Sequence, residues 1–187
     1  EYQDLFGGDA MLVLISAKPG KTIADIATPK NLAELRRAAD ELRSNTDQVY
    51  AVLDPSVAMQ WTSNLILGET GESASAPAGQ ALLYASQNDP TPEGKAARTK
   101  NVLENLTRLN AIPPAQRTMD NPEWITFLLR DNDGAVRKSL RPIFPDEQHA
   151  QMVVRLAGNG TLEQGGAGSA SPPRSGREAA RRPTSPR

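Results

Sequence analysis

Short apolar runs flanked by turn-forming residues predict three β-strands in this chain. The first covers residues 10–15 and is bounded by a glycine pair and a proline–glycine pair. The others cover residues 48–53 and 151–156. Continuous apolar runs of this length are typical of strands that are covered on both faces. We therefore expect residues 10–15 to form a central strand packed beneath helices.

Apolar residues at helical spacing predict three helices between these strands. The first begins with Thr28 as N-cap and Pro29 at the first helical position, where its missing N–H is harmless, and it ends near Ser44. The second covers residues 92–110 with a leucine-rich stripe. The third, which is shorter, begins after Asn121 as its cap.

The order of these elements predicts an α+β fold. Residues 10–53 read strand, helix, strand, which is one βαβ unit with parallel strands and a right-handed crossover. Residues 136–140 are expected to form a short edge strand. Residues 131–134 (Asp-Asn-Asp-Gly) form a turn by Asn/Asp–Gly chemistry, and their spacing does not match an EF-hand calcium loop.

A small and polar stretch, residues 67–92, interrupts this pattern and is interpreted as a mobile loop. A short helical turn is expected within it at residues 80–86. Loops of this length are usually either functional or loosely held. Trp61 precedes the loop, so we expect this side chain to lie at the mouth of a groove rather than in a core.

Charge divides the chain into an acidic body and a basic tail. Residues 165–187 hold five arginines and one glutamate, whereas the rest holds 16 basic and 21 acidic side chains. The tail consists almost entirely of Gly, Ala, Ser, Pro and Arg, which cannot bury enough apolar surface to offset the entropy of ordering, so we predict that it is disordered. An acidic body argues against a nucleic-acid partner.

Candidate chemistry is sparse, and we expect neither an enzyme nor a metal or cofactor site. The chain has no cysteine and one histidine, His149, which lies in a polar turn beside Asp146 and Glu147 and is interpreted as solvated. It contains no nucleophile elbow, phosphate loop or dinucleotide-binding motif. Its longest apolar run, residues 10–17, is too short to cross a bilayer.

Large apolar side chains are therefore the best candidates for a binding surface. We nominate Trp61 and Phe144 as candidate substrate-binding residues. Trp124 and Phe127 stand three residues apart on one predicted helix, and we interpret them as core packing.

Three segments of the chain carry a resemblance to a known family: residues 6–15 (FGGDAMLVLI), 28–35 (TPKNLAEL) and 144–159 (FPDEQHAQMVVRLAGN). Together they resemble the first extracytoplasmic (porter) region of MMPL-type transporters, the hydrophobe and amphiphile exporters of the resistance–nodulation–division superfamily. They occur in the same order and at comparable spacing, and the resemblance covers residues 1–164.

The resemblance implies a ferredoxin-like porter subdomain with helices on one face of a small mixed sheet. It also implies a location at the cell membrane, on the periplasmic or outer face, between two membrane helices. The partners would be the remainder of the transporter and a lipid or other amphiphile as cargo, exported at the expense of a proton gradient. The family's proton-relay acids lie in membrane helices, so none is carried over to this chain.

The chain departs from the family pattern after Leu162, where apolar periodicity stops. We hypothesise that residues 165–187 are not native porter sequence but a frameshifted or truncated end. Reading the encoding DNA in the other two frames tests this, because a native family member continues with an amphipathic helix. The alternative to a porter fragment is a free-standing extracytoplasmic α+β module that binds a lipid or a partner protein.

Overall fold

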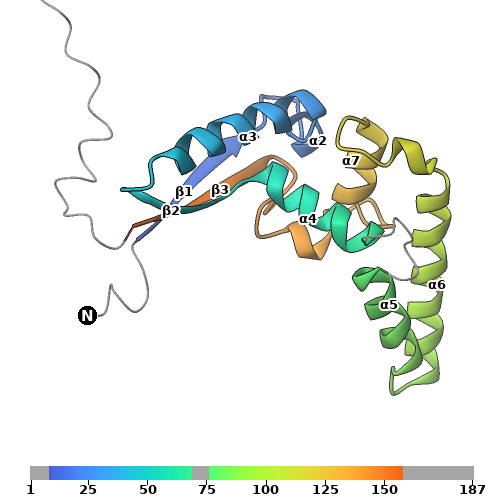
Figure 1. The fold of residues 1–187 in the computed structure, drawn as a ribbon. Coiled ribbons are helices and arrows are strands. Elements are labelled where there is room, and N and C mark those ends of the chain that lie inside the picture. Colours follow the sequence, from blue (N-terminus) through green and yellow to red (C-terminus); the bar gives the residue numbers. More distant parts are fainter. Residues whose placement is uncertain (1–8, 69–75, 158–187) are drawn as a thin grey trace, which may run out of the picture.

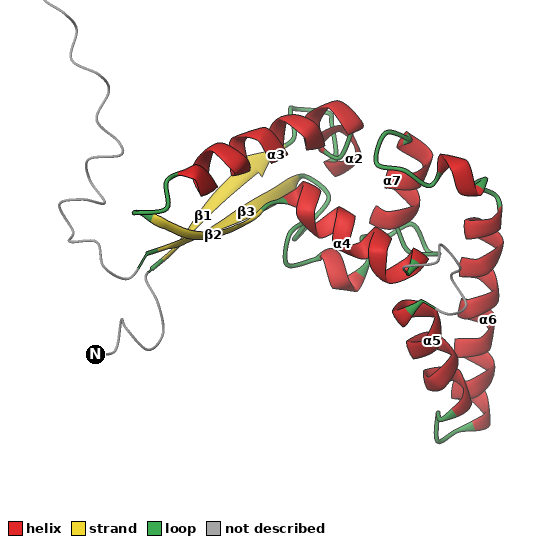
Figure 2. Ribbon diagram, in the orientation of Figure 1, coloured by secondary structure: helices red, strands yellow, loops and turns green. Residues whose placement is uncertain are grey.

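The computed structural model describes residues 9–68 and 76–157, and it confirms the predicted α+β class (Figure 1). Within these residues a small sheet lies at one end and most of the helices at the other (Figure 2). The basic tail, residues 165–187, lies outside the described residues, and so do residues 158–159, the Gly-Asn pair that ends the 144–159 segment.

The sheet contains β1 (Ala10–Ser16), β2 (Val49–Leu53) and β3 (His149–Leu156) in the order β1-β3-β2. Both pairs are antiparallel, with Val153 of β3 opposite Leu12 on one side and Leu53 on the other. β1 and β2 therefore run in the same direction, as predicted for a βαβ unit. The prediction of a mixed sheet is wrong for the described strands, because β3 lies between β1 and β2 and pairs antiparallel with both.

α3 (Pro29–Ser44) covers one face of the sheet. The Thr28 hydroxyl accepts a hydrogen bond from Asn31 N at 3.2 Å, which confirms the predicted cap. Ala39 of this helix packs in a cluster with Val49 and Val52 of β2 and with the alternate residues Met152 and Val154 of β3. Burial alternates along β3 from one residue to the next, because one face of the strand is covered by α3 and the other is open.

β1 is an exposed edge strand, so the prediction of a buried central strand is wrong. Leu12 and Leu14 on the open face are 62% and 61% exposed, and Met11 and Val13 on the other face are also exposed. The reason is topological: α3 packs on β2, and β3 occupies the central position. A continuous apolar run identifies a strand but does not fix its place in the sheet.

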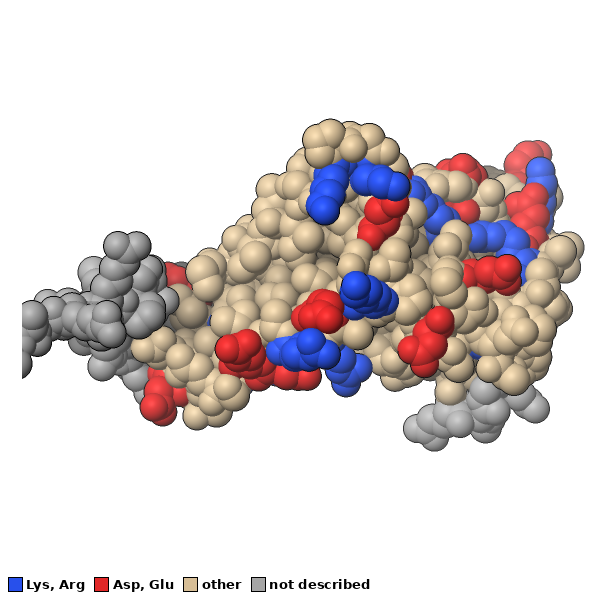
Figure 3. All heavy atoms as spheres, turned by 90° about the horizontal axis from the view of Figure 1, so that it is seen from above, with Lys and Arg blue, Asp and Glu red and all other residues tan. Residues whose placement is uncertain are grey.

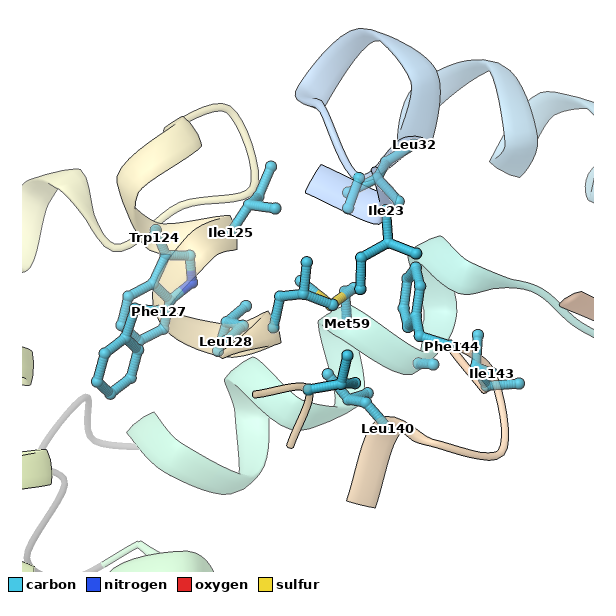
Figure 4. Packing of buried hydrophobic residues seen from close by; sticks show 14 of the residues in the cluster. Ile23, Leu32, Met59, Trp124, Ile125, Phe127, Leu128, Leu140, Ile143 and Phe144 are labelled. Carbon is cyan, nitrogen blue, oxygen red and sulfur yellow. The ribbon is translucent and has the colours of Figure 1, made fainter. Parts of the chain in front are cut away.

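The main hydrophobic core lies where the end of the sheet meets the helices. It joins α2 (Ile23–Ile26), α4 (Pro55–Leu67), α7 (Pro122–Leu129) and the 3-10 turn η2 (Lys138–Leu140). Ile23, Met59 and Phe144 approach one another there and are fully buried (Figure 4). Trp124 and Phe127 are also buried, as predicted, with ring centroids 5.2 Å apart.

α5 (Pro77–Gln87) and α6 (Pro92–Asn110) lie side by side as a helical hairpin that projects from this core (Figure 1). The predicted bounds of the second helix are confirmed, but the 67–92 segment is not simply a loop, since α5 lies within it. α5 contacts α4 and α6 and has no residue buried in the core. The pattern of apolar residues within one helix does not show which neighbouring helices it contacts. The short 3-10 turn η1 (Pro114–Gln116) leads from α6 toward α7.

Two smaller expectations concern the segment before β3. The turn at Asp131 is confirmed: Gly134 has a φ of 80° and its N–H donates to Asp131 O at 3.0 Å. The edge strand expected over residues 136–140 is wrong, because only Val136 forms a single bridge, with Arg130, before η2 begins.

Candidate functional site

An apolar groove of about 640 Å³ lies between α4, the α5–α6 hairpin and the segment around η2. Its floor is formed by buried apolar side chains from four parts of the chain: Ala58, Leu109, Phe127, Leu140 and Ile143. Its rim carries large apolar side chains that remain exposed: Trp61, Leu65, Leu82, Leu83 and Leu106. This volume lies within the range of pockets that hold small molecules.

α4 supplies one wall of the groove, and the sequence analysis did not predict this helix. Trp61 and Leu65 stand four residues apart, so they share one face. Asp54 caps the helix by accepting hydrogen bonds from Ser56 N at 2.8 Å and Val57 N at 3.2 Å. Asp54 followed by Pro55 at the first helical position is a recognisable start signal for a helix.

The α5–α6 hairpin supplies the opposite wall. Leu82 of α5 and Leu106 of α6 both line the groove and are about 40% exposed. No residue of α5 is buried, and the only residue of α6 that is buried is Leu109. The hairpin therefore presents its apolar stripe to an open space rather than to a filled core.

Arg137 is the only charged residue among the described residues that line the groove. Its side chain is 16% exposed, and its guanidinium lies 5.1 Å from the centre of the Phe127 ring. Nε and Nη2 donate to the carbonyl oxygen of Phe127 at 3.2 and 3.0 Å, and Nη2 also donates to Asn105 Oδ1 at 3.3 Å. A cation is thus held within a mostly apolar wall.

Burial is the main cause that lowers the pKa of Arg137 from its usual value. The carboxylate of Asp131 opposes this shift, with its Oδ1 3.7 Å from Nη1, and the nearby positive charge of Arg108 adds to it. Arginine nevertheless stays protonated at physiological pH, because its ordinary pKa is far above 7. The groove therefore contains a weakly compensated positive charge.

The two nominated binding residues are placed differently by the structure. Trp61 lies on the rim of the groove and is 58% exposed. Phe144 is fully buried in the main core and is not among the residues that line the groove, so we withdraw it as a candidate contact. The sequence analysis missed Arg137, because nothing in the pattern of residues 136–140 shows which helix this side chain approaches.

The charged surface elsewhere gives no comparable feature. On the face seen in Figure 3, acidic and basic side chains alternate rather than gather by sign. Ion pairs such as Arg37–Glu34 at 3.0 Å lie along α3 and are exposed. A second, shallower hollow along α6 is lined by charged and polar side chains, such as Lys95 and Lys100, together with Ala96 and Leu103.

His149 is not simply solvated, because its Nδ1 lies 2.8 Å from both carboxylate oxygens of Asp146. Backbone N–H donation from Gln148 and the contact with His149 lower the pKa of Asp146. This pairing closes the turn before β3. Over residues 9–68 and 76–157, no cluster of histidine and acidic side chains is arranged to hold a metal ion.

None of the helices described here has both the length and the apolar character that a membrane crossing requires. No protein-family model, curated protein or solved structure matches this chain.

Proposed function

We propose that this chain binds the apolar part of an amphiphile, such as a lipid, in the groove lined by Trp61. The observation that carries this proposal is the combination of a buried apolar floor with an exposed apolar rim. Water in contact with such a surface is released when an acyl chain covers it, and each buried methylene contributes about 0.8 kcal/mol. The proposal assigns no catalytic step to the chain.

Within this proposal, the chain is an extracytoplasmic porter domain of an MMPL-type exporter, and the groove is a surface that contacts cargo on its way outward. The resemblance of residues 6–15, 28–35 and 144–159 supports this placement. The membrane helices and the proton relay would belong to the remainder of the transporter, which is the expected partner. The strand directions are compatible with a ferredoxin-like subdomain, although the described residues contain only three of its strands.

The alternative function is that of a free-standing extracytoplasmic module that holds a lipid or a partner protein in the same groove. The encoding gene separates the two: a run of about 20 apolar residues immediately upstream of Glu1 favours the transporter. The groove by itself serves either protein, so this distinction does not alter the binding experiment.

Quenching of tryptophan fluorescence by a brominated fatty acid tests the proposal. Bromine quenches an indole that it contacts, so bromododecanoate should quench Trp61, whereas unbrominated dodecanoate should not. Trp124 is fully buried and donates from Nε1 to Ser63 Oγ at 3.2 Å, so it is the internal reference. In the Trp61→Phe variant, most of the quenching should disappear while the emission of Trp124 remains.

A relocated tryptophan provides the matched control. Tyr50 is 71% exposed on the open face of the sheet, so Tyr50→Trp in the Trp61→Phe background reports on an exposed position outside the groove. We expect little quenching there. We also expect the affinity to rise more than tenfold from decanoate to dodecanoate, because two more methylenes are buried. Equal quenching at both tryptophan positions, or no dependence on chain length, would exclude the groove as the binding site.

A further inference from the structure

The wall of the groove combines a large apolar surface with a single type of charge. Arg137 is its one charged member among the described residues, and its uncharged polar members are Thr62, Asn105 and Ser139. A groove that served only to cover hydrocarbon would gain nothing from a guanidinium, since desolvating a charge is costly. The presence of Arg137 therefore requires either a structural role or a ligand.

Part of the Arg137 side chain has a structural role. Nε and Nη2 satisfy the carbonyl of Phe127, which belongs to the last turn of α7 and has no partner within that helix. Nη1 makes no hydrogen bond within the described residues, and its nearest carboxylate oxygen, Asp131 Oδ1, is 3.7 Å away. Nε and Nη2 of the guanidinium are thus held by the Phe127 carbonyl, whereas the N–H groups of Nη1 can still donate to a ligand.

The adjacent Phe127 ring gives this cation a fixed position. The guanidiniums of Arg137 and Arg108 lie 5.1 and 5.3 Å from the ring centre. Arg108 donates to Asn132 Oδ1 at 3.0 Å and to the carbonyl of Arg130 at 3.2 Å, and it lines the shallow hollow along α6 instead of the groove. Of these two cations, only Arg137 belongs to the apolar groove.

We propose that Arg137 makes the groove selective for single-chain amphiphiles with an anionic headgroup, whose charged oxygen it binds through Nη1 while the chain lies on the apolar floor. This inference rests on the proposed function and adds the class of headgroup to it. Two arguments support it: the positive charge of the wall complements an anion, and a hydrogen bond between two charged groups is strong where water is excluded. A cationic headgroup would instead be repelled by the like charge of Arg137.

Matched amphiphiles of equal chain length test the inference. The probes are dodecanoate, dodecyl maltoside and dodecyltrimethylammonium at pH 8, each held below its micelle concentration, and binding is measured by calorimetry on the full chain. We expect dodecanoate to bind at least about tenfold more tightly than the neutral maltoside, and the ammonium to bind most weakly. Acetate at the same concentration should not compete, because the headgroup alone lacks the buried chain.

Two substitutions of Arg137 and one of Arg108 separate a specific role of Arg137 from a general effect of positive charge. Arg137→Gln should remove the preference for dodecanoate, while Arg137→Lys should keep most of it. Arg108→Gln is the control, because it removes one positive charge beside the same Phe127 ring but outside the groove. It should leave the preference unchanged. Thermal unfolding of each variant, with the maltoside as a neutral probe, shows whether the groove itself is intact.

The outcomes distinguish failure of the inference from failure of the proposed function. Equal binding of all three probes, with the chain-length dependence intact, would overturn charge selectivity and leave an apolar binding site. A preference for dodecanoate that survives Arg137→Gln would also overturn it, because another cation would then be responsible. Binding of none of the probes would remove both proposals. Competition by acetate would indicate an anion site that does not involve the apolar floor.

Discussion

At the scale of single residues, a buried carboxylate fixes the junction between the sheet and the groove. Asp54 is fully buried between β2 and α4, caps α4, and accepts a hydrogen bond from Arg43 Nη2 of α3 at 2.8 Å. Arg43 Nη2 also donates to the carbonyl of Val52. Attraction from Asp54 and Asp40 outweighs the opposing effect of burial and raises the pKa of Arg43. The Asp54 side chain, which directly follows β2, thus connects α3 and α4.

Replacement of Asp54 by alanine should lower the free energy of unfolding by about 3 kcal/mol or more. The change removes a helix cap, which costs about 1 kcal/mol, and leaves a partly buried arginine without its buried partner. Urea denaturation followed by circular dichroism measures the loss. Asp40→Ala is the control, because it removes the exposed partner of the same arginine and should change stability by less than about 1 kcal/mol. Equal losses in the two variants would contradict the assigned role of Asp54.

At the scale of the elements, β1 is the least typical part of the fold. Its seven residues, AMLVLIS, contain no charge and no proline, and they pair only with β3 among the described strands. Unprotected apolar edges of this kind favour association with other chains. The open face adds to this surface, because Leu12 and Leu14 lie beside Val153 and are not covered by α3.

Lysine substitution at Leu12 and Leu14 should therefore raise the solubility of the isolated chain without unfolding it. Both positions are more than half exposed, so we expect the free energy of unfolding to change by no more than about 0.5 kcal/mol for each. Static light scattering as a function of concentration measures association. Val154→Lys on the covered face is the control and should unfold the chain, because it buries an unpaired charge. Unchanged association in the double variant would show that the chains do not associate through β1.

At the scale of the whole molecule, stability is expected to be unevenly distributed. Five residues of α7 are buried in the main core, whereas none of α5 is. The turn between α5 and α6 is held by polar contacts, such as Arg98 Nε to Asp89 Oδ2 at 2.6 Å. The hairpin therefore contributes little to the buried core, and one wall of the groove belongs to the part that opens most readily.

Hydrogen exchange should show this difference directly. Backbone amides of α5 should exchange faster than those of α7 by several orders of magnitude, because local opening of α5 exposes little buried apolar surface. Added dodecanoate should slow exchange in α5 and leave β3 nearly unchanged. Mass spectrometry of peptic fragments follows both segments in one experiment. Protection of α5 equal to that of α7 before ligand is added would contradict the uneven distribution.

Local patterns were sufficient for much of the secondary structure, because they depend on residues close in the sequence. The caps at Thr28 and Asn121 and the apolar stripe of α6 each predicted a helix that the structure contains. The same kind of signal at Asp54 and Pro55 precedes α4 but was overlooked. For the candidate site, the position of Trp61 next to a polar segment indicated a groove, whereas the burial of Phe144 depends on distant contacts.

The sequence by itself determined the α+β class, the three strands and three of the six α-helices among the described residues, because period and capping are properties of neighbouring residues. Only the tertiary structure decided that β3 lies between β1 and β2, that β1 is an edge, and that Arg137 belongs to the wall of the groove. These features depend on which surfaces meet across long separations in the chain. Exclusion of water from those surfaces selects the pairing, and no local pattern encodes that choice.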